Sequence, residues 1–259
     1  MGENKDKEGG GTAYIEQQRF EAALERIVGK KHDDKGIGTL SEKTVHGVLK
    51  HFLEPDEDCH EVALEGYFAD IYNKDGVTEI QTRQFNRLRE KLTVFLNYYP
   101  VTVVYPMPAE KWVSWIDPLT GDVSKKRKSP KHFTEYDAFY ELYKIKQYLK
   151  NPNLNIELIM LDMEEYKLLN GWNDTRKRGS TRYDRIPLGI RQMILLEQPE
   201  DYMQFIPYEL DGSFTSKDFA RACGISERTA GLALNVLHYM GTVRRVGRQG
   251  HSYVYEVDN

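Results

Sequence analysis

The chain of 259 residues is poor in cysteine, in long apolar runs and in net charge. Its two cysteines, Cys59 and Cys223, lie far apart, which argues against a disulfide framework or a cysteine-based zinc cluster and favours a reducing, cytoplasmic compartment. No apolar run approaches the length of a membrane-spanning helix, so we expect no membrane association. The net charge of −4 argues against a basic protein that coats nucleic acid. With these classes excluded, we expect a globular protein, and a chain of this length can form one or two domains.

Motifs of several other activities are also missing. The sequence contains no glycine-rich phosphate-binding loop and no Ser/His/Asp arrangement. His46 and His60 lack the spacing of zinc ligands. The first residues, MGENKDKEGGG, are typical of neither a signal peptide nor a transit peptide, so we expect a disordered tail over 1–12.

Apolar periodicity predicts a mixed series of helices and strands, and therefore an α+β fold. The helices are expected over 13–29, 40–53, 83–97 and 134–149. Short strands are expected within 60–82, buried strands over 100–107 and 155–163, and a hairpin around 118–121. The segment 170–187 is rich in Gly, Arg and Asp and poor in apolar residues, which predicts a linker.

The most informative segment is a predicted hairpin with the sequence GYFADIYNKDGVTEIQT. Its Asp75-Gly76 dipeptide strongly favours a two-residue turn. That turn would place Asp70 opposite Gln81 and diagonal to Glu79, and strand alternation would put all three on one face. Two carboxylates that converge in this way can bind one cation, so the hairpin is a candidate metal site. In the alternative interpretation, both carboxylates are solvated strand residues.

Together with its flanking helices and the strand VTVVYP, this hairpin resembles the core of the PD-(D/E)XK phosphodiesterases, which include restriction endonucleases and Holliday-junction resolvases. The resemblance covers about residues 38–107 and implies an αβββαβ, restriction-endonuclease-like core. It implies that Asp70, Glu79 and the Ile80 carbonyl bind Mg²⁺ or Mn²⁺. The catalytic residues that it implies are Asp70, Glu79, Gln81 and Glu42. Gln81 stands where the family has a lysine, and Glu42 has a helix-capping role as its alternative.

The C-terminal part, 188–259, resembles a winged helix-turn-helix domain. The likeness lies in the order helix, turn CGIS, helix and hairpin, with RRVGRQGHSYVY as the wing. It implies DNA contacts from the second helix and from the wing. The DNA-binding residues that it implies are Arg228, Thr229, Arg244, Arg245, Arg248 and His251.

These observations predict a nuclease-like core over 13–169, extended by a hairpin, and a C-terminal winged helix domain. We expect a Mg²⁺-dependent endonuclease that hydrolyses phosphodiester bonds in DNA. The basic clusters KKRKSPK and RKRGSTRYDR would add phosphate contacts. Two alternatives stay open: a catalytically inactive DNA-binding regulator, and a protein–protein adaptor that uses the winged helix. The sequence also leaves open DNA or RNA as substrate, the target, and the oligomeric state, with a homodimer as one option.

Overall fold

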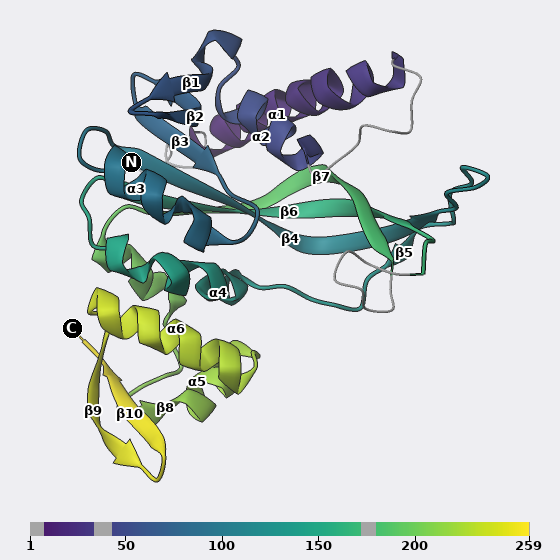
Figure 1. Ribbon diagram of the computed structural model, residues 1–259. Coiled ribbons are helices and arrows are strands. Elements are labelled where there is room, and N and C mark those ends of the chain that lie inside the picture. The colour runs from purple at the N-terminus through teal and green to yellow at the C-terminus, as the bar shows by residue number, and fades with distance from the viewer. Residues whose placement is uncertain (1–7, 34–42, 172–179, 259) are drawn as a thin grey trace, which may run out of the picture. The chain divides into compact units, whose positions relative to one another are not determined.

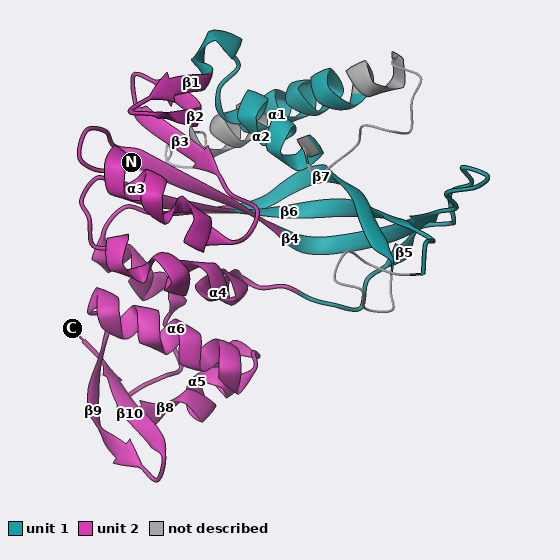
Figure 2. Cartoon of the chain, viewed as in Figure 1, with its two compact units in different colours: residues 1–60, 108–132, 159–192 teal, residues 61–107, 133–158, 193–259 magenta. Residues whose placement is uncertain are grey.

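The computed structural model describes residues 8–33, 43–171 and 180–258, with side chains described for 16–28 and from residue 44 onward within these ranges. The chain forms two compact units, each built from three separate stretches of sequence (Figure 2). Unit 1 comprises 1–60, 108–132 and 159–192, and unit 2 comprises 61–107, 133–158 and 193–259. Strands β4, β6 and β7 supply residues to both units.

A seven-stranded sheet has the order β1-β2-β3-β4-β6-β7, with β5 paired to β4 (Figure 1). The strands are β1 (His60–Leu64), β2 (Tyr67–Asn73), β3 (Gly76–Ile80), β4 (Val101–Ile116), β5 (Arg127–Lys128), β6 (Leu154–Leu168) and β7 (Thr181–Leu196). β2 and β3 are antiparallel, whereas β3 and β4 are parallel. Parallel neighbours need a crossover, which the 3₁₀ helix η2 (Phe85–Leu88) and helix α3 (Arg89–Phe95) provide. This mixed sheet with its helices confirms the predicted α+β class.

Unit 1 contains the N-terminal helices α1 (Glu8–Asp33) and α2 (Lys43–Leu53), followed by the 3₁₀ helix η1 (Glu57–Cys59). Phe20 and Phe52 pack edge to face, with ring centroids 5.8 Å apart, and Arg19 donates to the Phe52 carbonyl oxygen at 2.8 Å. Both predicted helices are therefore present and packed together. Because α1 begins at Glu8, it includes part of the segment predicted as a disordered tail, while 1–7 lie outside the described residues.

The C-terminal part of unit 2 has the predicted order of helix, turn, helix and hairpin. Its elements are η5 (Pro199–Phe205), β8 (Phe214–Thr215), α5 (Ser216–Cys223), α6 (Glu227–Met240), β9 (Val243–Gln249) and β10 (Ser252–Val257). The three strands form a separate antiparallel sheet in the order β8-β10-β9. Gly224 ends α5 in the left-handed conformation, and Ser226 caps α6.

These C-terminal elements share a core with the middle of the chain. The helix predicted over 134–149 is divided into η3 (Glu135–Ala138), α4 (Phe139–Leu142) and η4 (Tyr143–Tyr148). Within unit 2, the Tyr136 ring lies 6.0 Å from the Phe205 ring and 5.9 Å from the Phe219 ring. Residues from 193 onward are therefore part of a larger unit, which differs from the separate domain expected over 188–259.

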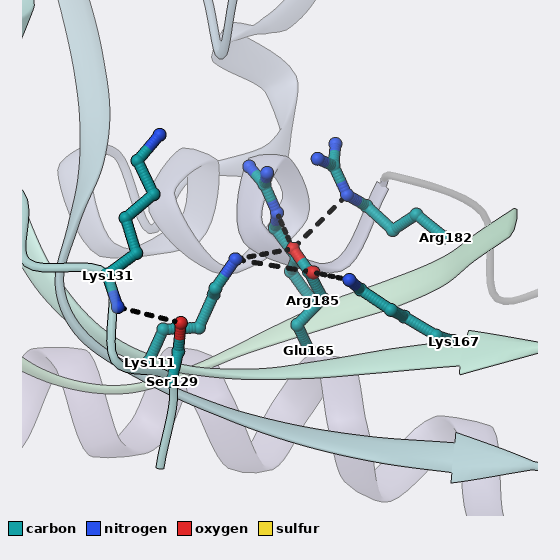
Figure 3. A network of polar contacts seen from close by, with 7 residues as sticks. All are labelled: Lys111, Ser129, Lys131, Glu165, Lys167, Arg182 and Arg185. Carbon is teal, nitrogen blue, oxygen red and sulfur yellow. Dashed lines mark hydrogen bonds and ion pairs between the residues drawn. The ribbon is translucent and has the colours of Figure 1, made fainter. Parts of the chain in front are cut away.

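The segment predicted as a linker, 170–187, also differs from expectation. Strand β7 begins at Thr181, and residues 172–179 lie outside the described residues. The strand is polar because Arg182 and Arg185 contact Glu165 of β6. The charged residues at the start of β7 therefore belong to an ion-pair network within a strand and do not indicate a loop (Figure 3). Within the described ranges, every helix is too short or too polar to cross a membrane.

Candidate metal site on the hairpin of β2 and β3

The hairpin of β2 and β3 turns one residue earlier than predicted. Asn73 pairs with Gly76, so the two turn residues are Lys74 and Asp75. The Asn73 Oδ1 atom accepts a hydrogen bond from the Asp75 N–H at 2.9 Å. An Asn side chain that bonds to the backbone two residues later forms an Asx turn, which competes with the Asp-Gly turn expected from the sequence. The prediction of a turn at Asp75 and Gly76 is wrong.

Gly76 serves a different purpose at the start of β3. Its φ is +115°, and a Cβ at this position would lie 2.4 Å from the Pro100 carbonyl oxygen. The Val77 N–H donates to the same oxygen at 2.9 Å. Gly76 is therefore required where β3 approaches the beginning of β4, a contact between residues distant in the sequence.

The register of the hairpin, continued by one residue, sets Asp70 opposite Glu79. The paired residues run from Asn73 and Gly76 to Ile71 and Thr78, and the next position on each strand is Asp70 and Glu79, with both side chains on one face. The Asp70 Oδ2 atom accepts a hydrogen bond from the Ile80 N–H at 2.7 Å. Two carboxylates in directly opposed positions are closer to each other than the diagonal arrangement predicted from the sequence.

Glu79 is buried, with 3% of its surface exposed. Burial first, and then the charge of Asp70, raise the pKa of Glu79 to about 7, although Lys91 acts in the opposite direction. The Lys91 Nζ atom lies 2.7 and 2.6 Å from the two carboxylate oxygens of Glu79. A carboxylate that titrates near neutral pH can exchange its proton for a metal ion at little cost.

Lys91 is the site residue that sequence reasoning missed. It lies on α3, between the buried residues Leu88 at the end of η2 and Phe95. Positions 88 and 95 are three and four residues from position 91, and such positions are neighbours on a helix. A lysine beside these apolar residues was the available signal, since an ammonium group that is partly removed from water favours a carboxylate partner.

Gln81 takes a different position from the one predicted. Its backbone N–H donates to the Val104 carbonyl oxygen at 2.9 Å, and its Nε2 atom donates to the Arg83 carbonyl oxygen. The register of the hairpin excludes the predicted pairing of Gln81 with Asp70. Glu42, the remaining candidate catalytic residue, lies outside the described residues.

The donors of this hairpin suit a hard cation with few protein ligands. We call Asp70, Glu79 and the Ile80 carbonyl the hairpin site. In the part of the chain that the structure describes, no three His, Cys, Asp or Glu side chains gather into a metal site. Mg²⁺ is bound in many enzymes by one or two carboxylates and several water molecules, so two carboxylates fit this ion.

Of the two predicted DNA-binding residues of α6, Thr229 faces the interior of unit 2, whereas Arg228 is exposed. Thr229 is 6% exposed, and its Oγ1 atom lies 2.8 Å from Ser226 Oγ and 3.3 Å from the Tyr140 hydroxyl. The Arg228 guanidinium lies over the Tyr140 ring, 5.8 Å from its centroid. The start of α6 is therefore packed against α4, so Thr229 does not present its side chain to a ligand.

The predicted residues of the β9–β10 hairpin lie at the surface. Arg245 and Arg248 lie over the Tyr253 ring at 4.0 and 4.6 Å from its centroid, and Arg248 donates to the Tyr253 hydroxyl at 2.9 Å. Arg244 instead pairs with Glu256 at 2.8 Å. His251 is exposed at the hairpin tip. Arg245 and Arg248 with Tyr253 thus form an exposed cationic and aromatic surface, which we call the wing surface.

Comparison with known proteins identifies a family without assigning an activity. The family described as "Domain of unknown function (DUF8091)" matches residues 43–197, which end one residue after β7. An uncharacterized protein from Treponema pallidum (strain Nichols) is 28% identical over 167 residues. That alignment covers 64% of this chain and 64% of the relative, so the chain spans less than two thirds of the relative's length. No solved structure matches the chain.

Proposed function

We propose that this chain, which belongs to the DUF8091 family, is a metal-dependent nuclease whose hairpin site binds Mg²⁺ or Mn²⁺. The observation that carries the proposal is the opposed pair Asp70 and Glu79, in which Glu79 is buried and its pKa is about 7. A buried carboxylate beside a second carboxylate is unfavourable unless a proton or a cation compensates its charge. The order helix, hairpin, helix and parallel strand around this pair supports the resemblance to PD-(D/E)XK phosphodiesterases.

The hairpin residues have separate tasks in phosphodiester hydrolysis. A bound divalent cation would lower the pKa of a water molecule and withdraw charge from the scissile phosphate. Asp70 is held in place by the Ile80 N–H, and Glu79 by Lys91. Fixed carboxylates keep their orientation while the substrate enters, which is the requirement for a preorganised site.

Lys91 supplies the positive charge that Gln81 lacks. Its ammonium group touches both oxygens of Glu79, so the charge lies within the hairpin site although it comes from α3. A cation at this place can stabilise charge that develops on the phosphate. Gln81 offers a neutral amide and holds its own loop through the Arg83 carbonyl.

We assign DNA binding to the C-terminal elements as a winged helix. The order β8, α5, α6, β9 and β10 is that of the winged helix fold, and β9 with β10 corresponds to the wing. Since Thr229 is buried at the start of α6, the wing surface is the better candidate for the contact with DNA. Arginine and tyrosine together suit a phosphate backbone and exposed bases.

One observation favours a non-catalytic DNA-binding regulator as the second candidate. Lys91 already contacts both Glu79 oxygens and competes with a metal ion for them. A hairpin in which this ion pair persists would retain the fold and lose hydrolysis.

Cleavage of plasmid DNA separates the two functions. The wild-type chain should nick supercoiled DNA with Mg²⁺ or Mn²⁺ and not with EDTA. Asp70→Asn and Glu79→Gln should each reduce the rate by roughly 100-fold or more, because each removes a metal ligand. Asp75→Asn is the matched control, since Asp75 is an exposed carboxylate on the same hairpin. A wild-type chain that binds DNA and cuts neither DNA nor RNA with either metal contradicts the nuclease and supports the regulator.

A further inference from the structure

A row of aromatic side chains leads from the hairpin site towards the surface of unit 2. Lys91, whose Nζ atom contacts Glu79, lies on α3 with this atom 5.8 Å from the centre of the Phe95 ring (Figure 1). Phe95 is fully buried, and its ring lies 6.2 Å from the ring of Tyr99. Positions 91 and 95 are neighbours on a helix, so the row follows one side of α3. It begins at the proposed metal ligands and continues beyond the end of the helix.

The row ends in three tyrosines from two parts of unit 2. The Tyr99 ring lies 5.5 Å from the ring of Tyr72 on β2 and 6.2 Å from the ring of Tyr98. Both pairs meet at steep angles, 73° and 56°, within the range of distances that aromatic pairs favour. Tyr98 is 65% exposed. We call Tyr72, Tyr98 and Tyr99 the tyrosine cluster, in which Tyr98 forms the exposed end.

The backbone that carries Tyr98 is held in place. The N–H groups of Tyr98 and Tyr99 both donate to the Phe95 carbonyl oxygen, at 3.0 and 2.9 Å. The Tyr99 hydroxyl donates to Glu65 Oε1 at 3.4 Å. The next residue, Pro100, has a restricted φ angle and accepts the hydrogen bond from β3 described above. A tyrosine with a fixed backbone and only two side-chain torsions loses little conformational freedom when a ligand covers its ring.

Strand β2 connects the tyrosine cluster with the hairpin site. Tyr72 pairs with Val77, and Asp70 precedes Tyr72 by two residues on the same strand. Side chains two residues apart on a strand share a face and are separated by roughly 7 Å along it. This separation is comparable to the distance between successive phosphates of an extended single strand. A strand with its scissile phosphate at the hairpin site would therefore have a neighbouring base at the tyrosine cluster.

We propose that the tyrosine cluster is a stacking site for an unpaired base of the DNA strand that enters the hairpin site. Tyr98 is the ring that contacts the base, and Tyr72 and Tyr99 support it. The proposal rests on the proposed function for its choice of ligand. Every base has a flat aromatic face that stacks on tyrosine, so such a site tolerates many sequences. The cluster positions the strand and takes no part in bond cleavage.

This proposal defines the class of substrate more closely. Inside a duplex, each base already stacks on its neighbours and has no free face for a tyrosine. The tyrosine cluster therefore favours a single strand, or the unpaired part of a flap or junction, over a continuous duplex. RNA supplies the same base chemistry as DNA, so the experiment includes both.

Binding of a short labelled single strand of DNA to the full chain, measured by fluorescence anisotropy in EDTA, tests the proposal. Tyr98→Leu keeps an apolar side chain and removes the aromatic ring, so it should weaken binding by about fivefold to 150-fold, the range for one stacked base. Tyr98→Phe keeps the ring and should bind as the wild-type chain does. Binding of a blunt duplex of the same sequence should be equal in all three proteins. Tyr98 is exposed, so we expect each variant to fold.

Tyr208→Leu is the matched control, because Tyr208 is a 99% exposed tyrosine of the same unit outside the tyrosine cluster. It should bind the single strand as the wild-type chain does. A series of strands with one abasic sugar in each position in turn locates the contact. At one position, loss of the base should weaken binding to the wild-type chain and leave binding to Tyr98→Leu unchanged. The RNA of the same sequence, measured with the same variants, distinguishes the two sources of the base.

Three results would overturn the stacking site. They are unchanged binding of both single strands in Tyr98→Leu, an equal loss in Tyr208→Leu, and an equal loss for the blunt duplex. Because these measurements need no metal and no cleavage, they are separate from the test of the nuclease. If Tyr98→Leu alone loses binding while the wild-type chain never cuts nucleic acid, the stacking site stands and hydrolysis fails. If the wild-type chain cuts DNA and Tyr98→Leu binds single strands equally well, the stacking site fails and hydrolysis stands.

Discussion

Lowering the pH from 8 to 6 should weaken binding of Mg²⁺ or Mn²⁺ to the hairpin site about tenfold. The cause is Glu79, whose pKa is raised to about 7 by burial and by the charge of Asp70. With a pKa of about 7, roughly nine-tenths of Glu79 is ionised at pH 8 and roughly one-tenth at pH 6. A metal ion binds the ionised carboxylate, so the apparent affinity follows this fraction and levels off above pH 8.

The protonation of Glu79 also changes the stability of the folded chain, and its raised pKa fixes the direction of that change with pH. Because the pKa of Glu79 is higher in the folded state than its ordinary value of 4.5, Glu79 favours folding most at pH values below about 4.5. That contribution is lost as the pH rises through about 7. A bound metal ion compensates for the loss, so the rise in Tm on addition of Mn²⁺ should be larger at pH 8 than at pH 6.

Calorimetric titration with Mn²⁺ at a series of pH values from 5.5 to 8.5 measures the effect. Asp75→Asn should retain the tenfold dependence, whereas Glu79→Gln should bind weakly at every pH. Lys91→Met removes a cation that lowers the pKa of Glu79, so the midpoint should move above 7. A dissociation constant that is equal at pH 6 and pH 8, or an unchanged dependence in Glu79→Gln, refutes this reasoning.

Three further predictions concern other parts of the chain. Gly76→Ala should lower the free energy of unfolding by about 2 kcal/mol or more in urea titrations, because it combines a positive φ with a clash against Pro100; Gly66→Ala, which has open space around it, should lose about 1 kcal/mol. Glu165→Gln should remove on the order of 3 kcal/mol of stability at pH 7, and the difference from wild type should shrink as the pH falls from about 4.5 to 2. Arg248→Gln should weaken DNA binding several-fold and lower the salt slope by about 0.9 in anisotropy titrations.

Each of these has a result that contradicts it. Equal losses in the two glycine variants would remove the role assigned to the contact with Pro100. A Glu165→Gln variant with the same acid unfolding profile as wild type would show that the ion pairs add no net stability. Arg221→Gln, an exposed arginine of α5, is the control for the wing, and an equal effect there would exclude a specific contribution from Arg248.

Local patterns predicted the elements that form the hairpin site. The apolar pattern correctly gave the strands within 60–82, the buried strand that begins β4 and a helix between them, because burial leaves a pattern in the sequence. It also placed Asp70 and Glu79 on a common face. The turn was misplaced because Gly76 is required by its close contact with Pro100. Pro100 is 24 residues away in the sequence, so this contact gives no local signal.

Two other differences have the same origin in contacts between distant residues. Lys91 was overlooked because its partner Glu79 belongs to a different element, and a lysine at one position of a helix stripe is a weak signal by itself. The start of β7 was taken for a linker because Arg182 and Arg185 look like solvated charges until Glu165 on β6 is placed between them. The sequence records charge, and the structure shows which charges are paired.

Diffraction from crystals of the chain soaked in Mn²⁺ at pH 8, recorded at a wavelength with anomalous scattering from manganese, tests the proposed metal site most directly. We expect an anomalous peak within about 2.5 Å of one carboxylate oxygen of Asp70 and one of Glu79, with Lys91 displaced from at least one Glu79 oxygen. The peak should be absent in Glu79→Gln crystals treated in the same way. A wild-type hairpin without a peak, with Lys91 still on both oxygens of Glu79, would contradict the metal site and the hydrolysis that depends on it.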